Sequence, residues 1–364
     1  MAHRVANLTK MKLLPSILFF LLALAATLHA QERPDMEARL KQFLERYPAA
    51  DLDKDGKLTR EEVRAFNEKR KGEASDRKQR ERTRPEPTHA NVTYGDHQRQ
   101  RFDLYLAPRE EGDAANPLAI YIHGGGFRGG SKNGISPGSI AAYHKAGISV
   151  AAIEYRLSDV GPYPIMMEDA ARCLQTIRHR ADEWHIDPQR IGCYGGSAGA
   201  GISLWLGFHD DLADPDSDDP IARQSTRILA AGISNGQSTY DMRTFAEWFG
   251  VPNLKPHAAL VTFYAVEKPE DWNSERVKEL MTDASAMTHL SKDDVPVYAT
   301  YGKGNVPVDA STSEGVWVHH VLLGLKLQEA MKELDLECVV RSPEHKDGDP
   351  HGSMERFFIT TLKP

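Results

Sequence analysis

The chain has 364 residues, and its 45 Lys and Arg against 52 Asp and Glu give a formal net charge of −7. With 40% hydrophobic residues the composition is that of a folded protein, which excludes a chain that is disordered throughout. Proteins that coat nucleic acid need an excess of basic residues, so we expect no nucleic-acid partner for this acidic chain.

Residues 1–30 have the pattern of a secretory signal peptide. Three basic residues precede an apolar run at 13–28, and the small residue Ala30 comes just before a polar stretch. As a helix, this run of about 16 residues would rise about 24 Å, less than the ~30 Å hydrocarbon core of a bilayer, so we expect no stable membrane span. The sequence therefore predicts cleavage after Ala30 and a secreted or periplasmic protein.

The three cysteines are too few, and odd in number, for a disulfide framework even in an exported protein. Cys173 lies in a helical pattern, and Cys193 and Cys338 lie in apolar runs typical of strands. We therefore expect three buried free thiols.

Residues 35–71 are predicted to form two helices joined by a loop, and residues 72–88 a charged linker or helix extension. Within the loop, residues 51–62 fill every ligand position of a twelve-residue calcium site, and Gly56 permits its sharp turn. The segment resembles the EF-hand family over about residues 36–70, which implies calcium as a cofactor. The implied ligands are Asp51, Asp53, Asp55, Lys57 through its backbone carbonyl, Thr59 and Glu62.

EF-hands usually occur in pairs, but only one is visible here. The apolar face of a single hand must meet the rest of the chain, a second chain or solvent, and the sequence does not identify this partner. In an extracellular setting such a loop would hold calcium for stability rather than for signalling. No His or Cys spacing suggests zinc.

From residue 89 to 364, short apolar runs alternate with helical patterns, which predicts an α/β fold with a mainly parallel sheet and helices on both faces. Residues 236–290 are less regular, and we expect them to form a cap over the carboxyl edge of the sheet. The predicted strands are 102–106, 118–123, 150–154, 191–194, 228–233, 295–301 and 338–341, and the main helices are 164–180, 198–208 and 316–334.

A Gly-x-Ser-x-Gly motif at residues 195–199 lies between a predicted strand and a predicted helix. A serine at such a tight turn has its hydroxyl pushed out of the sheet, above the amide groups of the helix N-terminus. This context predicts that Ser197 is a nucleophile.

A second glycine-rich segment, residues 123–127, follows the predicted strand 118–123. Consecutive glycines let backbone N–H groups point into a cavity, as acyl transfer requires for the oxyanion of its intermediate. We expect the oxyanion donors to be the N–H groups of Gly125, Gly126 and Ala198. A flexible turn or a phosphate-binding loop is the alternative, although neither phosphate-binding pattern is complete.

With these motifs the chain resembles the α/β-hydrolase superfamily over about residues 89–364, in the branch of hormone-sensitive-lipase-like and carbohydrate-esterase-like enzymes, including acetyl-xylan and feruloyl esterases. The resemblance depends on residues 123–127 and 195–199 together with 155–157, 163–164 and 186–191. It implies a catalytic triad whose members follow the order Ser, Asp or Glu, His along the chain.

That order places the base near the C-terminus, where His351 is our candidate and His345 the alternative. The adjacent His319 and His320 lie in a helical pattern, which is more typical of surface or packing residues. For the acid, relatives have an Asp shortly after the strand that corresponds to 295–301. Asn305 occupies about that place in this chain, so we favour Asp309, with Glu314 and Asp241 left open.

These features predict a secreted serine esterase that acts on polysaccharide-linked or other small acyl esters. The uncertain acid motivates an alternative of a different class, a weakly active or inactive hydrolase-fold protein that serves as a calcium-stabilised binding or scaffold module. A peptidase of the prolyl-oligopeptidase kind is disfavoured because the chain is too short to include an N-terminal propeller.

Overall fold

The computed structural model describes residues 36–363, so the predicted signal peptide at 1–30 lies outside the described residues. The chain divides into two compact units, Met1–Arg82 and Thr83–Pro364, which we describe separately. Within the described part, no helix combines the length and the apolar character needed to cross a bilayer.

The first unit is helical. Helix α2 (Met36–Arg46) and a short 3-10 turn η1 (Pro48–Ala50) precede helix α3 (Arg60–Thr83), so α3 continues through most of the segment predicted as a linker. The ring of Phe43 lies 4.9 Å from that of Tyr47 and 6.1 Å from that of Phe66, measured between centroids. These aromatic contacts join α2 to α3 and hold the loop between them.

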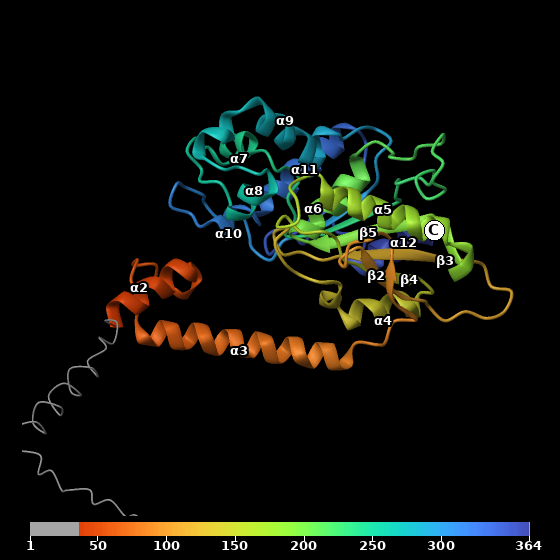
Figure 1. Ribbon diagram of the computed structural model, residues 1–364, viewed down its shortest axis with the longest axis horizontal. Helices are drawn as coiled ribbons and strands as arrows, with labels where there is room; N and C mark the ends of the chain where they lie inside the picture. Colours follow the sequence, from red (N-terminus) through yellow and green to blue (C-terminus); the bar gives the residue numbers. More distant parts are fainter. Residues whose placement is uncertain (1–35, 364) are drawn as a thin grey trace, which may run out of the picture. The chain divides into compact units, whose positions relative to one another are not determined.

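The second unit contains an eight-stranded sheet in the order β1-β2-β4-β3-β5-β6-β7-β8. Figure 1 shows helices on both sides of this sheet. Strands β1 and β2 are antiparallel to their neighbours, and the pairs from β4 to β8 are parallel. The predicted α/β fold with a mainly parallel sheet is therefore confirmed. The strands are β1 (His89–Thr93), β2 (Arg101–Tyr105), β3 (Asn116–Ile122), β4 (Ser149–Ile153), β5 (Ile186–Gly196), β6 (Ala231–Ser234), β7 (Val297–Thr300) and β8 (Cys338–Arg341).

Alternate side chains of the central strands belong to two separate hydrophobic cores, one on each face of the sheet. In β3, Leu118 and Ile120 pack toward α5 and α6, whereas Ala119 packs toward α4 and α12. This period of two is what a strand requires when both faces of its sheet are covered. The helices of this unit are α4 (Pro137–Lys145), α5 (Ile165–His179), α6 (Ala198–Phe208), α7 (Met242–Phe249), α8 (Ala258–Phe263), α9 (Glu275–Ala284), α10 (Glu314–Trp317), α11 (Val321–Glu333) and α12 (Met354–Leu362), with 3-10 turns η2 (Lys132–Gly134), η3 (Asp182–Trp184), η4 (Pro269–Asn273) and η5 (Ala286–Thr288).

The helix predicted at 316–334 is broken in the structure into α10 and α11. His320 is the N-cap of α11, and its side chain accepts a hydrogen bond from the N–H of Leu322. Trp317 and Val318 pack with Phe245 of α7 in a small third core. This packing fixes the three residues between the two helices in a non-helical turn.

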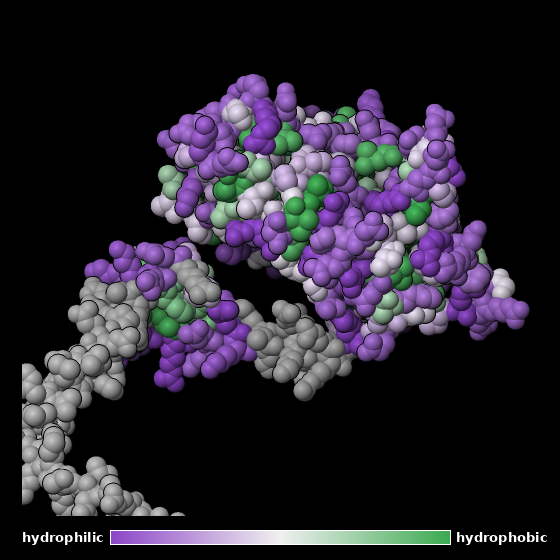
Figure 2. Space-filling model, in the orientation of Figure 1, coloured by the Kyte–Doolittle hydropathy of each residue, from purple (hydrophilic) through white to green (hydrophobic). Residues whose placement is uncertain are grey.

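The segment predicted as a cap, 236–290, forms helices α7, α8 and α9 with the short turns η4 and η5. Figure 2 shows hydrophobic residues on the visible face of the second unit only in small groups among hydrophilic ones. The three cysteines are buried and free, as expected for inert thiols. Burial raises the pKa of Cys193 to about 12, which keeps the thiol protonated.

Candidate active site

Ser197 lies at the turn between β5 and α6. Its φ of 51° and ψ of −120° are strained for a residue with a side chain. The turn is held by a hydrogen bond from the N–H of Ser197 to the carbonyl oxygen of Ser234, at 2.9 Å. A Cβ atom at Gly199 would lie 2.0 Å from the carbonyl oxygen of Ile122, so only glycine fits there. The second glycine of the motif thus lets helix α6 approach β3 closely.

The imidazole that contacts this serine belongs to His319. Its Nε2 lies 2.9 Å from the Oγ of Ser197, and its Nδ1 lies 3.1 Å from the carbonyl oxygen of Gly315. Because a carbonyl can only accept, Nδ1 carries the proton and Nε2 is free to accept one from the serine. Burial lowers the pKa of His319, and Lys303 adds to this effect, so the ring favours its neutral form.

Ser197 and His319 line a cavity of about 490 Å³. Residues from the glycine-rich segment, from the start of α6 and from the segment 236–290 enclose it. The lining includes all three predicted oxyanion residues, and its members are Gly125, Gly126, Phe127, Arg128, Gly129, Ala198, Gln237, Tyr240, His257, Ala259, Leu260 and Val318.

His257 is a second histidine in this cavity. Its Nδ1 accepts a hydrogen bond from the N–H of Ala259, at 3.1 Å, as the N-cap of α8. The proton of the neutral ring is therefore on Nε2. Burial lowers the pKa of His257, so the neutral ring can offer an N–H donor beside the serine.

Arg99, which the sequence did not single out, holds the glycine-rich segment in place. Its guanidinium donates to the carbonyl oxygen of Gly130 at 3.1 Å and to the Nε2 of His123, also at 3.1 Å. The Nδ1 of His123 in turn donates to the carbonyl oxygen of Gly124, at 2.8 Å. Tyr155 stacks on the buried His123 ring at 4.3 Å and donates its hydroxyl proton to the carbonyl oxygen of that residue. Both ends of the loop are thus fixed by polar contacts.

The structure does not bring His351 to Ser197. Its Nε2 lies 2.9 Å from the Oε1 of Glu337, and its ring packs against Phe357 at 5.1 Å. The histidine within hydrogen-bond reach of the serine is His319, which the helical pattern had assigned to the surface or to packing. His345, the other candidate, bonds through Nδ1 to the hydroxyl of Ser342 at 2.9 Å.

The predicted acids also lie apart from this pair. The exposed carboxylate of Asp309 accepts from the hydroxyls of Ser311 and Thr312, and these local bonds lower the pKa of Asp309. The remaining candidates are likewise bonded elsewhere: the N–H of Asn305 to Glu344, Glu314 to the N–H of Ala258, and Asp241 to Arg243. In the described part of the chain, the partner of the His319 Nδ1 is therefore the carbonyl oxygen of Gly315.

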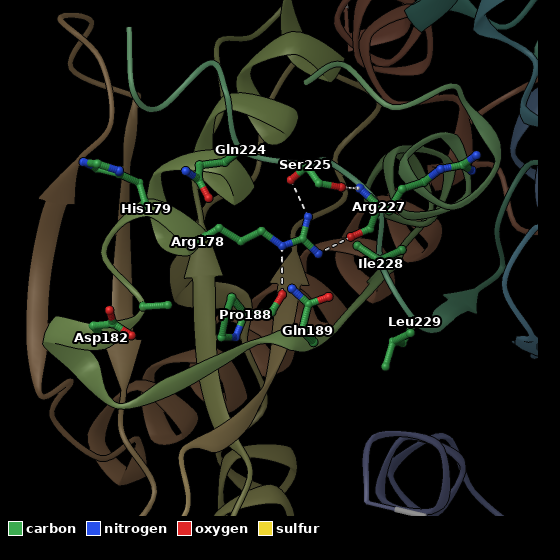
Figure 3. Close-up of a pocket in the computed structure, with 11 residues that line it drawn as sticks. Arg178, His179, Asp182, Pro188, Gln189, Gln224, Ser225, Arg227, Ile228 and Leu229 are labelled. Carbon is green, nitrogen blue, oxygen red and sulfur yellow. Dashed lines mark hydrogen bonds between the residues drawn. The ribbon is translucent and has the colours of Figure 1, made fainter. Parts of the chain in front are cut away.

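A second cavity, of about 420 Å³, lies at the amino ends of β5 and β6, the opposite edge from Ser197 (Figure 3). Its central side chain is Arg178, whose guanidinium donates to the carbonyl oxygens of Pro188, Ser225 and Arg227. These backbone acceptors occupy all three guanidinium nitrogens. Arg178 therefore joins two chain segments, and this cavity is not the candidate active site.

In the first unit, the loop between α2 and α3 brings three predicted calcium ligands together. One carboxylate oxygen from each of Asp51, Asp53 and Asp55 lies within 4.8 Å of the others. The Oδ1 of Asp51 is buried and has no hydrogen-bond partner, which fits a position that a cation would occupy. Gly56 has a φ of 80°, and its N–H donates to the Oδ2 of Asp51.

Glu62 closes the same loop. Its carboxylate accepts hydrogen bonds from the N–H and hydroxyl of Thr59, and these bonds lower its pKa to about 2. The other oxygen accepts from the N–H of Leu52, at 2.8 Å. The N–H of Lys57 donates a hydrogen bond to Asp55. This bond fixes the turn in which the carbonyl of Lys57 would serve as a calcium ligand. The oxygen-rich donor set suits calcium.

Known structures resemble this chain over most of its length. A truncated carbohydrate esterase from gut microbiota aligns with a TM-score of 0.59 and 19% identity, covering 77% of this chain and 99% of that chain. An acetyl ester-xyloside bifunctional hydrolase from Caldicellulosiruptor lactoaceticus aligns with a TM-score of 0.53 and 20% identity, covering 71% and 86%. At these identities, the likeness shows a shared fold.

Curated relatives share a part of the sequence. The probable carboxylic ester hydrolase LipM of Mycobacterium tuberculosis is 26% identical over 226 residues, 62% of this chain and 50% of that protein. The probable isoprenylcysteine alpha-carbonyl methylesterase ICMEL2 of Arabidopsis thaliana is 30% identical over 155 residues, 42% and 35%. The chain thus spans half or less of these relatives. The BD-FAE family model matches residues 102–317, which is more than half of the chain, so the protein belongs to the BD-FAE family.

Proposed function

We propose that the protein is a serine carboxylic-ester hydrolase in which Ser197 is the nucleophile and His319 the general base. The observation that carries the proposal is the 2.9 Å contact between the Oγ of Ser197 and the Nε2 of His319, at a strained strand-to-helix turn that faces a cavity. The curated relatives named as ester hydrolases support the same reaction class.

In the proposed reaction, the Oγ of Ser197 attacks the acyl carbonyl carbon while the Nε2 of His319 takes the hydroxyl proton. The carbonyl of Gly315 keeps the ring oriented and faces the N–H of the imidazolium that forms. The N–H groups of Gly125, Gly126 and Ala198 are the proposed donors to the oxyanion. His319 then returns the proton to the leaving alcohol, and water, deprotonated by the same ring, hydrolyses the acyl-serine.

We propose a small acyl group attached to a larger polar alcohol, such as a polysaccharide, as the substrate. Tyr240, Leu260 and Val318 give the cavity an apolar part, where an acyl chain would lose its contact with water. The exposed Arg128 and the N–H of His257 offer polar contacts to the alcohol portion. The carbohydrate esterases with the same fold are consistent with this substrate class.

The contact between His319 and a backbone carbonyl favours one alternative, a protein with weak catalysis that acts mainly by binding. A carbonyl dipole stabilises the imidazolium less than a carboxylate does, and loss of that charge costs about 10⁴ in rate in serine proteases. A Ser197-dependent kcat of about 1 s⁻¹ or more, as is typical of enzymes, would separate the enzyme from this binding module.

The test is hydrolysis of p-nitrophenyl acetate by four forms of the protein. We expect Ser197→Ala and His319→Ala each to lose at least about 10³ in kcat, because both groups take part in bond making. His351→Ala is the matched control and should stay within about threefold of the wild type. The assignment of the base fails if His351→Ala is inactive and His319→Ala retains the wild-type rate.

We also propose that residues 51–62 bind one Ca²⁺ ion. The oxygen ligands would come from Asp51, Asp53, Asp55, Thr59, Glu62 and the carbonyl of Lys57. The Oδ1 of Asp51, which has no hydrogen-bond partner, supports this proposal. The bound ion would offset the repulsion among the clustered carboxylates. Calorimetric titration should show one site that is lost in Asp53→Ala and kept in Asp96→Ala, an exposed control.

We further propose that the protein is exported, which is supported by the signal-peptide pattern of residues 1–30. Cell fractionation should find the mature protein outside the cytoplasm, with Gln31 at its N-terminus by intact mass. Recovery of the uncleaved chain in the cytoplasm would contradict the proposal.

A further inference from the structure

Three side chains that the proposed reaction does not use gather near the far end of helix α6. His209 directly follows this helix, Asp283 lies in α9, and His289 follows η5. One candidate ligand atom from each side chain lies within 4.8 Å of the other two. Two imidazoles and a carboxylate form a donor set that suits zinc and its neighbours among the transition metals.

Hydrogen bonds to neighbouring groups hold all three side chains in place. The Nδ1 of His209 lies 3.1 Å from the carbonyl oxygen of Asp210, and the Nε2 of His289 lies 2.8 Å from the carbonyl oxygen of Asp283. Because carbonyls only accept, these nitrogens carry the protons in the metal-free protein. The Nε2 of His289 is also the ring atom that lies 3.9 Å from the Oδ1 of Asp283, so binding of a metal by His289 would require its ring to give up the contact with the Asp283 carbonyl. The Oδ2 of Asp283 accepts from the hydroxyl of Tyr163 at 2.6 Å. Such outer contacts orient the ligands of metal sites.

The three side chains contact buried aromatic residues and are also accessible to solvent. The ring of His209 lies 4.1 Å from that of Trp205 and 4.6 Å from that of His289, measured between centroids. Tyr163 is buried, whereas the Asp283 side chain is 52% exposed and lines a surface cavity of about 420 Å³ with His289. A tetrahedral zinc site needs ligand atoms about 3.3 Å apart, so side-chain rotations, including one of the His289 ring, would complete the site.

We propose that His209, Asp283 and His289 bind one Zn²⁺ ion, with water at the fourth position. The ion would join the end of α6, the helix that begins just after Ser197, to α9 and the residues that follow η5. It would therefore fix the nucleophile helix against the segment 236–290, which lines the candidate active site. This site differs from the calcium loop of the first unit, whose ligands are all oxygens.

The test is titration of the metal-free full chain with Zn²⁺ in the presence of excess Ca²⁺, which keeps the calcium loop filled. Calorimetry should show one zinc site and a higher Tm for the zinc-bound protein. His209→Ala and His289→Ala should weaken binding at least about 100-fold. Tyr163→Phe removes only the hydroxyl behind Asp283, so it should fold normally and bind about 10- to 100-fold more weakly.

His179→Ala is the matched control, because His179 is exposed on α5 and belongs to none of these contacts; it should bind zinc like the wild type. Circular dichroism of each variant establishes that its fold is retained before binding is compared. The proposal is overturned if the wild type takes up no zinc at micromolar concentration. Equal zinc binding by the wild type, His209→Ala and His289→Ala would overturn it as well.

Discussion

Backbone strain at Ser197 sets the position of the reacting hydroxyl. A non-glycine residue with a φ of 51° and a ψ of −120° costs about 1–3 kcal/mol, which the surrounding structure must offset. The carbonyl of Ser234 accepts the Ser197 N–H, and the carbonyl of Ser197 accepts the N–H of Gly201. These bonds fix the turn so that the hydroxyl meets His319 without rearrangement.

The pKa of His319 predicts how the reaction depends on pH. The base must be neutral, and burial lowers its pKa below the ordinary value of about 6.5. We therefore expect kcat/KM to fall only as pH drops through an apparent pKa below 6.5. Lys303 contributes to the shift, so Lys303→Gln should raise that apparent pKa, while Lys332→Gln on α11 should leave it unchanged. A pH–rate profile with an acid limb above 6.5 would contradict this assignment.

Gly125 and Gly129 offer a matched pair of substitutions in the glycine-rich loop. Gly125 has a φ of 120°, and a Cβ there would lie 2.4 Å from the carbonyl oxygen of Gly129. A Cβ at Gly129 meets nothing within 4 Å. We expect Gly125→Ala to move the proposed oxyanion donors and to reduce kcat about 100-fold or more, and Gly129→Ala to have little effect. Equal rates for the two variants would remove Gly125 from the mechanism.

At the scale of elements, the break between α10 and α11 positions the base. Trp317, which is fully buried, contacts Phe245 of α7 at 4.9 Å between ring centroids, and Leu323 of α11 completes this small core. His320 caps α11 and donates its Nε2 proton to the carbonyl oxygen of Val306. These contacts hold the turn in which the His319 ring faces the Oγ of Ser197.

Trp317→Ala should therefore affect both stability and activity. Removal of a buried tryptophan side chain costs about 3–5 kcal/mol, which urea denaturation would measure. Even where the variant remains folded, we expect a lower kcat, because the turn that holds His319 loses its packing. Val306→Ala, at an exposed position, is the control and should change neither quantity appreciably. A folded Trp317→Ala variant with the wild-type kcat would show that this core does not position the base.

At the scale of the whole molecule, the chain consists of two compact units, each with a proposed site of its own. The proposed calcium loop lies in Met1–Arg82, and the candidate active site lies in Thr83–Pro364. The first unit is small, and its apolar residues Phe43 and Phe66 are only half-buried. A bound ion would therefore contribute a large share of its stability.

Calcium should therefore slow amide hydrogen exchange in the first unit much more than in the second. We expect hydrogen exchange to show slower exchange of amides in 51–62 when Ca²⁺ is added, because the N–H groups of Gly56 and Thr59 donate to carboxylates that the ion would fix. Exchange in β3 and β5 should be unchanged. Protection that rises equally in both units would contradict this separation.

The sequence by itself determined the fold class and the turn in which the proposed nucleophile lies, because both follow from local patterns. Alternation of apolar runs and helical periods dictates a covered parallel sheet, and glycines on both sides of Ser197 mark the tight turn in which it lies. The proposed calcium loop is equally local, since its predicted ligands lie within twelve consecutive residues.

Only the tertiary structure decided which histidine meets the serine. Residues 316–334 have an unbroken helical pattern, and histidine is not a typical N-cap, so no local signal marks the break before α11. That break comes from the contact of Trp317 with Phe245, residues distant in sequence. The cluster of His209, Asp283 and His289 is hidden in the same way, because His209 is brought to the other two only by the packing of α6 against η5, which follows α9. A site whose residues are brought together by long-range packing has no characteristic residue spacing, so the sequence alone does not reveal it.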